Sequence, residues 1–306
     1  SIYQKGFLLG LQKDYRGKIS AMDRLISEYP ESQYVDDALF EKGRSYVLLE
    51  NSSSAAQAFE KLIREFPQSS LARKAGIQLG LLYYNDNQPE KALTAYKQVI
   101  SNYPGSEEAK IALQDLKSVY IDLNDINAYA SYVNSIGGNI RLEVGEQDSL
   151  TYIAAEKLFM RGDNDGARRS LVNYLQTFPE GAFSSNANFY LGSIAFAKKE
   201  FDEAVQRFKS VIASGDTKFL EESVARTAEI EYLGNDYPAA LESFKRLQIV
   251  AENPENKQAA RLGIMRCALQ TGQQKDALLA ADELLKEPKL SPELEAEARY
   301  VRAKAY

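Results

Sequence analysis

A motif of about 37 residues recurs along the whole chain, and this period constrains the fold more than any other feature of the sequence. Three segments that end in an aromatic residue followed by a proline, at Pro30, Pro67 and Pro104, lie 37 residues apart, and a fourth copy ends at Pro179. Twelve residues before each proline stands a position that is usually alanine. Across the 306 residues this anchor position reads Lys18, Ala55, Ala92, Ala128, Ala167, Ala204, Ala240 and Ala277, at intervals of 37, 37, 36, 39, 37, 36 and 37 residues. Eight repeats therefore tile the chain.

Two further positions in each repeat predict a pair of helices. A large side chain stands four residues after the anchor in most copies, as Phe59 and Phe208 do. Twelve residues before the anchor the side chain is mostly small, as at Gly43 and Gly192. A small residue with large ones at helical spacing is typical of an amphipathic helix, and it lets a second helix approach closely. Each repeat is therefore interpreted as two antiparallel helices, A and B, packed small side against large.

Turn residues separate these helices at regular places. Polar and glycine-containing segments at 85–89, 162–165 and 234–238 are typical of the turn from A to B. Between repeats a proline ends one helix, and a serine two residues later is predicted to cap the next, at Ser32, Ser69 and Ser106. Ser291 followed by Pro292 follows the same logic. The whole chain is thus accounted for as helix and turn, which predicts an all-α fold.

The positions Gly43, Tyr46, Ala55, Phe59 and Pro67, repeated in the following copy, resemble the tetratricopeptide repeat. The family's usual tryptophan is absent, and the period exceeds its usual length of about 34 residues, so helices or turns must be slightly longer. The recurrent aromatic-Pro-x-Ser junctions are most similar to the envelope branch, which includes Tol-Pal-associated periplasmic proteins and the repeat lipoprotein of the outer-membrane β-barrel assembly machinery. The resemblance implies a right-handed superhelical solenoid in the periplasm or envelope of a Gram-negative bacterium, with the cytoplasm as the alternative.

The 39-residue interval divides the array. We expect repeats 1 to 4 in residues 1–136, an irregular inter-repeat turn at 137–148, repeats 5 to 8 in residues 149–290, and the first helix of a further, truncated repeat at 291–306. The turn is interpreted as a longer connection. The alternative is a hinge or docking element, because Gly137 precedes a second glycine and Ile140, Leu142 and Val144 form an apolar edge. The last helix has no partner, which predicts further repeats in the parent protein or self-association through this open end.

The residue types that are missing argue against catalysis and metal binding. The chain has no histidine and one cysteine, Cys267, so it cannot form a histidine-dependent nucleophile pair, an HExxH zinc site or a multi-cysteine metal site. Cys267 lies in an apolar stretch and is predicted to be a buried, inert thiol. The segment around Gly17 and Lys18 lacks the first glycine and the Ser or Thr of a phosphate loop. We therefore expect a non-enzymatic protein without cofactor or metal.

Charge and hydropathy restrict the partners. With 37 basic and 43 acidic side chains the net charge is −6, which argues against nucleic-acid binding through bulk positive charge. No run of residues approaches the 18 or so apolar residues of a transmembrane helix. The expected partner is therefore a protein or peptide.

The resemblance implies that the A helices line a concave groove, through positions 15, 11 and 8 residues before the anchor. The first and third of these lines are rich in aromatic residues and lie two helical turns apart, so they share one helix face. Aromatic side chains offer large contact area to a bound peptide. The predicted groove residues are Phe40, Arg44, Ile77, Tyr84, Lys117, Tyr120, Tyr152, Phe159, Phe189, Phe196 and Tyr232. The alternative is that these residues pack between neighbouring A helices.

The resemblance also restricts what such a groove binds. Family members that hold the carboxylate tails of chaperones carry Lys followed by Asn four residues later at two of these lines, and no repeat here has that pair. We therefore expect an internal segment or a folded surface of an unknown partner. The chain is interpreted as a protein-protein interaction scaffold in envelope assembly or maintenance. The alternative is a structural, self-assembling repeat segment without a peptide groove.

Overall fold

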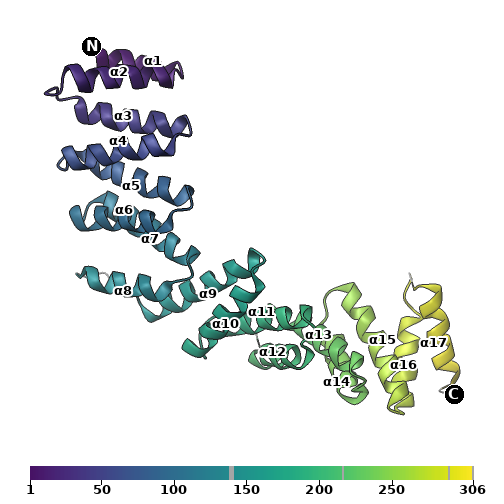
Figure 1. Ribbon diagram of the computed structural model, residues 1–306. Coiled ribbons are helices and arrows are strands. Elements are labelled where there is room, and N and C mark those ends of the chain that lie inside the picture. Colours follow the sequence, from purple (N-terminus) through teal and green to yellow (C-terminus); the bar gives the residue numbers. More distant parts are fainter. Residues whose placement is uncertain (138–140, 216, 289, 305–306) are drawn as a thin grey trace. The chain divides into compact units, whose positions relative to one another are not determined.

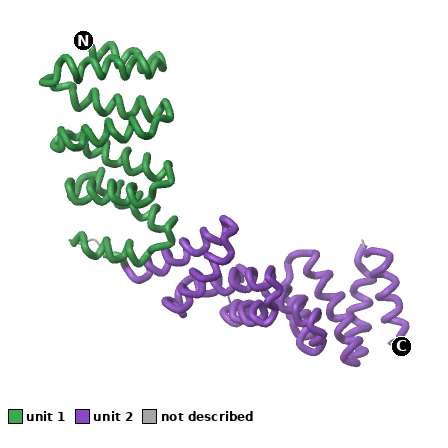
Figure 2. The backbone as a smooth tube through the Cα atoms, in the orientation of Figure 1, with its two compact units in different colours: residues 1–142 green, residues 143–306 purple. Residues whose placement is uncertain are grey.

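The computed structural model describes residues 1–137, 141–215, 217–288 and 290–304, and every regular element in this part of the chain is an α-helix. The predicted all-α fold is therefore confirmed. The chain forms two compact units, Ser1–Leu142 and Glu143–Tyr306, coloured separately in Figure 2. The first unit holds α1 (Ile2–Leu11), α2 (Tyr15–Glu28), α3 (Val35–Leu48), α4 (Ser52–Glu65), α5 (Ser70–Asn85), α6 (Pro89–Asn102), α7 (Glu107–Asp122) and α8 (Ile126–Ile136). The second holds α9 (Val144–Met160), α10 (Asn164–Thr177), α11 (Ser184–Ala197), α12 (Phe201–Ser214), α13 (Leu220–Leu233), α14 (Tyr237–Val250), α15 (Pro254–Gln270), α16 (Gln274–Leu284) and α17 (Pro292–Lys304).

Within each unit the helices are stacked in chain order, each packed against the helix before it and the helix after it (Figure 1). Odd-numbered helices are the A helices of the repeats and even-numbered helices are the B helices. The A helices also contact the A helix of the next repeat, as α3 contacts α5 and α13 contacts α15. Contacts are therefore confined to neighbouring repeats, which is the organisation of a helical repeat protein.

Helices A and B of one repeat meet through the predicted contact between a small and a large residue. A Cβ atom added at Gly43 would lie 2.5 Å from the Phe59 ring, and one added at Gly80 would lie 2.4 Å from the Tyr96 ring. Both rings are at most 1% exposed. The glycine is therefore needed because the aromatic ring of helix B occupies the space of its missing side chain.

The turn from A to B has the same backbone form throughout. In seven repeats a residue with positive φ lies five positions before the predicted anchor, for example Glu50 at 55° and Gly162 at 83°. The next residue but one before the helix start is left to cap helix B, and Asn51 and Asp163 accept hydrogen bonds there from backbone amides of the first turn. These turns fix the register of each repeat independently of the side-chain pattern.

In the fourth repeat this register corrects the predicted one. The left-handed residue is Asn124, 37 residues after Asn87, so the anchor five positions later is Tyr129 and not Ala128. Tyr129 is only 4% exposed, whereas Ala128 is half-buried. An alanine beside the true position drew the prediction one residue too early. The groove positions predicted for this repeat are shifted by the same residue.

The junctions between repeats are of two kinds. Ser69 and Ser106 cap α5 and α7 as predicted, and the Ser291 hydroxyl accepts a 3.3 Å hydrogen bond from the amide of Leu294 in the first turn of α17. Ser32 does not cap α3, so that prediction is wrong. Helix α3 starts later, after Tyr34, whose side chain makes no capping hydrogen bond.

At the second kind of junction an aromatic residue takes the N-cap position and stacks on an aromatic residue of the preceding A helix. The three pairs are Tyr3 with Tyr34, Tyr152 with Phe183, and Phe189 with Phe219, with ring centroids 5.3, 4.5 and 4.1 Å apart. Their interplanar angles are 17°, 4° and 13°. The stacked ring anchors the start of the next helix, which replaces the missing side-chain cap.

The irregular segment is shorter than predicted. Helix α9 begins at Val144, so residues 144–148 form its first turns and not a loop. Asp148 is buried and accepts hydrogen bonds from the Tyr174 hydroxyl at 2.5 Å and from the amide of Ala182 at 2.9 Å, which ties α9 to α10 and to the connection after it. The boundary between the units, after Leu142, falls inside the predicted turn. The apolar edge proposed there includes Ile140, which lies outside the described residues.

Candidate functional site

Two of the eleven residues predicted to line a groove are buried in the helix packing, and for them the prediction is wrong. Tyr120 is 5% exposed and its ring centroid lies 5.9 Å from that of Tyr129, because the register of this repeat differs by one residue. Tyr152 is 2% exposed, since Phe183 stacks on its ring and Glu156 accepts a 2.6 Å hydrogen bond from its hydroxyl. Burial raises the pKa of Tyr152, so this phenol stays protonated at neutral pH.

The other predicted residues are accessible to different degrees. Arg44 is exposed, and the half-buried ones are Phe40, Ile77, Tyr84, Lys117, Phe159, Phe189, Phe196 and Tyr232. Tyr84 donates a hydrogen bond to Asp122 on the next A helix, and Arg44 pairs with Glu41 at 3.3 Å on its own helix. Lys117 is displaced from the groove position by the one-residue shift of the fourth repeat. The aromatic ladder is therefore partly a packing device between repeats.

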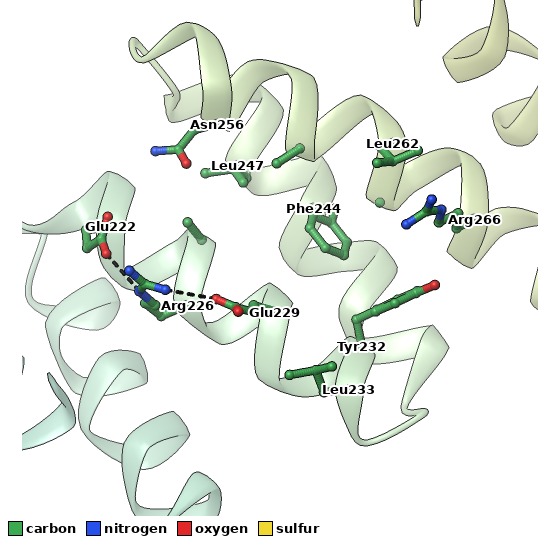
Figure 3. Close-up of a pocket in the computed structure, with 13 residues that line it drawn as sticks. Glu222, Arg226, Glu229, Tyr232, Leu233, Phe244, Leu247, Asn256, Leu262 and Arg266 are labelled. Atoms are coloured by element: carbon green, nitrogen blue, oxygen red, sulfur yellow. Dashed lines mark hydrogen bonds and ion pairs between the residues drawn. The ribbon is translucent and has the colours of Figure 1, made fainter. Parts of the chain in front are cut away.

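The three predicted lines meet at one concavity in the second unit. A pocket of about 300 Å³ lies between α13, α14 and α15 (Figure 3). Its lining includes Ala225, Glu229 and Tyr232, which stand 15, 11 and 8 residues before the anchor of the seventh repeat. The next A helix adds Leu262 and Arg266, at the first and second positions of the eighth repeat. Tyr232 is the one residue of the predicted set that lines this pocket.

The floor and walls of the pocket are apolar. Phe244 and Leu247 of α14 line it and are 8% and 1% exposed. Tyr232 packs edge-on against Phe244, with ring centroids 6.4 Å apart. Leu233, which also lines the pocket, is 58% exposed and stands at its mouth. Such a hollow suits an apolar side chain better than a polar one.

The pocket lies at the junction where the aromatic pair of other repeats is absent. Ala225 holds the position that Phe189 holds one repeat earlier, where Phe189 stacks on Phe219. Helix α15 begins after Asn253, whose side chain caps the helix through the amide of Glu255 at 2.8 Å. A small residue thus stands where a ring stands in the preceding repeat, and no ring precedes the next helix.

Charged groups on one rim are held in a fixed arrangement. The Arg226 guanidinium donates from Nε to Glu222 at 2.8 Å and from Nη1 to Glu229 at 3.0 Å (Figure 3). Its carbon Cζ lies 4.8 Å from the ring centroid of Phe196 on α11. Burial alone would lower the pKa of Arg226, but the two carboxylates outweigh it and raise that pKa. One cation therefore serves two anions here.

The opposite rim is electrically balanced. Arg266 donates from Nε and Nη2 to the two carboxylate oxygens of Glu297 on α17, at 2.7 and 2.8 Å. The hydrogen bonds from Arg266 lower the pKa of Glu297, and the carboxylate in turn raises the pKa of Arg266. This two-pronged pair also ties the last helix to α15.

Sequence reasoning missed Glu222, Arg226 and the other charged residues of the rim. Glu229 and Arg266 did fall on the middle groove line, but their partners lie at helical spacings that the line does not include. The missing aromatic residue at Ala225 was a usable signal, because it interrupts a line that is otherwise large. Elsewhere in the described residues no cluster of histidine, cysteine or acidic side chains could hold a metal ion, and no helix there is long and apolar enough to cross a membrane.

Comparisons with known proteins match separate parts of the chain to family models. Tetratricopeptide-repeat models match residues 1–32 and 154–217. A model of the YfiO family, described as an outer membrane lipoprotein, matches residues 35–119. No curated protein matches the chain.

Solved structures with similar backbones include several helical repeat proteins. The chain of Naa15/Naa10 bound to HypK is 16% identical, with 97% of this chain and 43% of that chain covered and a TM-score of 0.46. The present chain thus spans less than half the length of that relative. The TPR2AB domain of yeast Sti1 in complex with an HSP90 peptide is 13% identical, over 87% and 97%, with a TM-score of 0.39. A tetratricopeptide repeat protein from Parabacteroides merdae is 15% identical, over 88% and 98%, with a TM-score of 0.33.

Proposed function

Since the chain is built from tetratricopeptide repeats, we propose that it is a non-enzymatic scaffold that binds a segment of a partner protein on its A helices, in the assembly or maintenance of a Gram-negative cell envelope. The observation that carries the proposal is the pocket between α13 and α15. Residues from all three groove positions meet there around an apolar floor. A preformed hollow with an apolar floor and a polar rim is the usual form of a binding site.

The envelope part of the proposal rests on the match of residues 35–119 to an outer membrane lipoprotein family. The aromatic-Pro-x-Ser junctions at Phe66 and Tyr103, which led to the same branch from the sequence, lie inside this matched range. Both observations concern the first unit, whereas the pocket belongs to the second. A protein of this kind would hold its partner with one unit while the other takes part in a different contact.

A displayed library of random peptides tests the binding function. Two exposed leucines of the second unit provide a matched pair of variants: Leu233, 58% exposed at the pocket mouth, and Leu279, 56% exposed on the B helix α16. We expect peptides selected on the wild type to lose binding to Leu233→Lys and to keep it for Leu279→Lys. Both substitutions place lysine on an exposed site, so thermal melts should stay close to that of the wild type.

Three results would count against a peptide scaffold of this kind. The selection could enrich no peptide, the two variants could lose binding equally, or the selected peptides could ignore Leu233→Lys. A concentration-dependent rise in mass by sedimentation, together with any of these results, would favour the self-assembling alternative.

A further inference from the structure

We propose that the pocket between α13 and α15 receives one aromatic or large aliphatic side chain of a partner segment that carries a lysine or arginine next to it. This inference rests on the proposed scaffold function and specifies the chemistry of its partner. It combines two properties of the site: an unfilled aromatic position and an excess of negative charge on one rim.

The unfilled position indicates the apolar anchor. In the sixth repeat Phe189 and Phe219 stack at 4.1 Å and close the space between successive A helices. One repeat later Ala225 replaces the first ring and the N-cap Asn253 replaces the second, and a hollow of about 300 Å³ is found there. A ring from a partner would restore the contact that the chain makes for itself one repeat earlier.

The surfaces that such a ring would meet are already in place. Phe244 forms the floor and is 8% exposed, and Leu262 and Tyr232 stand on opposite walls. Because the floor is held by the contact of its ring with Gly263, where an added Cβ would lie 2.4 Å away, it cannot easily fold into the hollow. The pocket is therefore preorganised, which lowers the ordering cost of binding.

The charges indicate the neighbour of the anchor. Glu222 and Glu229 share the single cation Arg226, so this rim carries one net negative charge. On the other rim Arg266 is neutralised by both oxygens of Glu297. Each of the two rim glutamates keeps about half of its side chain exposed, at 45% and 47%. A partner cation would be attracted to this rim and a partner carboxylate repelled.

The peptide selection supplies the first test. We expect the peptides enriched on the wild type to share one aromatic or large aliphatic residue with a lysine or arginine within two positions. Synthetic versions of one such peptide then separate the two parts in fluorescence anisotropy. Replacing the apolar residue by serine should weaken binding at least about tenfold, as expected for a central anchor. Replacing the basic residue by glutamate should weaken it by a smaller factor that shrinks as salt is added.

Variants of the protein test the same two parts from the other side. Ala225→Phe introduces the ring of the preceding repeat, so it should fill the hollow, leave the melting temperature at or above that of the wild type, and abolish binding. Glu229→Lys should reverse the preference between the lysine and glutamate peptides. The matched control Glu242→Gln changes an acid of α14 that is 76% exposed and outside the pocket, and it should leave both affinities unchanged.

The outcomes distinguish this inference from the scaffold function. Peptides that bind through the pocket mouth but lack the aromatic-basic pair, or that bind Ala225→Phe or Glu229→Lys as they bind the wild type, overturn the inference and leave the scaffold function intact. A selection that enriches nothing overturns both. If Ala225→Phe melts lower than the wild type, the charge reversal at Glu229 and the synthetic peptides still decide.

Discussion

At the scale of single residues, the stack depends on glycines that face aromatic rings. Replacing Gly43 by alanine would place a Cβ atom 2.5 Å from the buried Phe59 ring, which has no free space to move into. We expect Gly43→Ala to lose about 1 to 3 kcal/mol of unfolding free energy through overpacking, even though alanine is the better helix former.

Gly145 in the first turn of α9 is the matched control, because a Cβ atom there meets nothing within 4 Å. Gly145→Ala should be neutral or stabilising by up to about 1 kcal/mol. Denaturant melts of both variants decide the matter. Equal effects of the two substitutions would show that helix propensity, and not the contact with Phe59, governs these positions.

A second residue-scale prediction concerns the single thiol. Cys267 is fully buried in α15, and burial raises its pKa to about 11. Because the thiolate is the reactive form, Cys267 should not react with a disulfide reagent at pH 8 in the folded protein and should react quickly once the chain is unfolded. Rapid labelling without denaturant would mean that α15 opens locally.

At the scale of helices, junctions with stacked rings should depend on the ring at the helix start. Phe219 makes no capping hydrogen bond and is held against Phe189 at 4.1 Å. Since Phe219 is half-buried, we expect Phe219→Ala to lose about 1 to 3 kcal/mol, less than a fully buried phenylalanine would. Tyr300→Ala on α17, at 62% exposure, should stay within about 0.5 kcal/mol of the wild type in the same melts. A loss no larger at Phe219 than at Tyr300 would contradict the role assigned to the stack.

The docking of α17 should depend on pH through Glu297. Hydrogen bonds from Arg266 lower the pKa of Glu297 in the folded chain, so the bridge contributes fully above the ordinary glutamate pKa of about 4.3 and is lost as the pH falls through the lower, folded value. Both side chains are about one-third exposed, which limits the contribution at pH 7 to about 1 kcal/mol. Glu297→Gln should therefore be less stable than the wild type at pH 7, and the difference should disappear near pH 3. A difference that is constant over this range would show that the charge of Glu297 is not involved.

The helices also show how far the sequence could predict this protein. The period, the glycine and aromatic positions and most caps follow from local rules, and they gave the fold. Tyr152 could not be assigned from its line, because its burial depends on Phe183 in the connection to the next helix. Tyr120 was misplaced because Ala128 satisfies the anchor pattern one residue before Tyr129, and only the backbone turn at Asn124 separates the two. The pocket depends on what is missing at Ala225, and the pattern was searched for residues that are present.

At the scale of the whole molecule, a chain whose contacts join neighbouring repeats should respond locally to damage. The helices form two compact units, 1–142 and 143–306, and contacts within each unit follow the order of the helices. Hydrogen exchange of Gly43→Ala should therefore show faster exchange of amides in α3 to α6 and unchanged protection in α13 to α16, where the pocket lies. Peptide binding by this variant should also be unchanged at temperatures where the second unit is folded. If protection falls equally in both units, the chain unfolds as one cooperative body, and a variant in the first unit would then weaken binding at the pocket through stability alone.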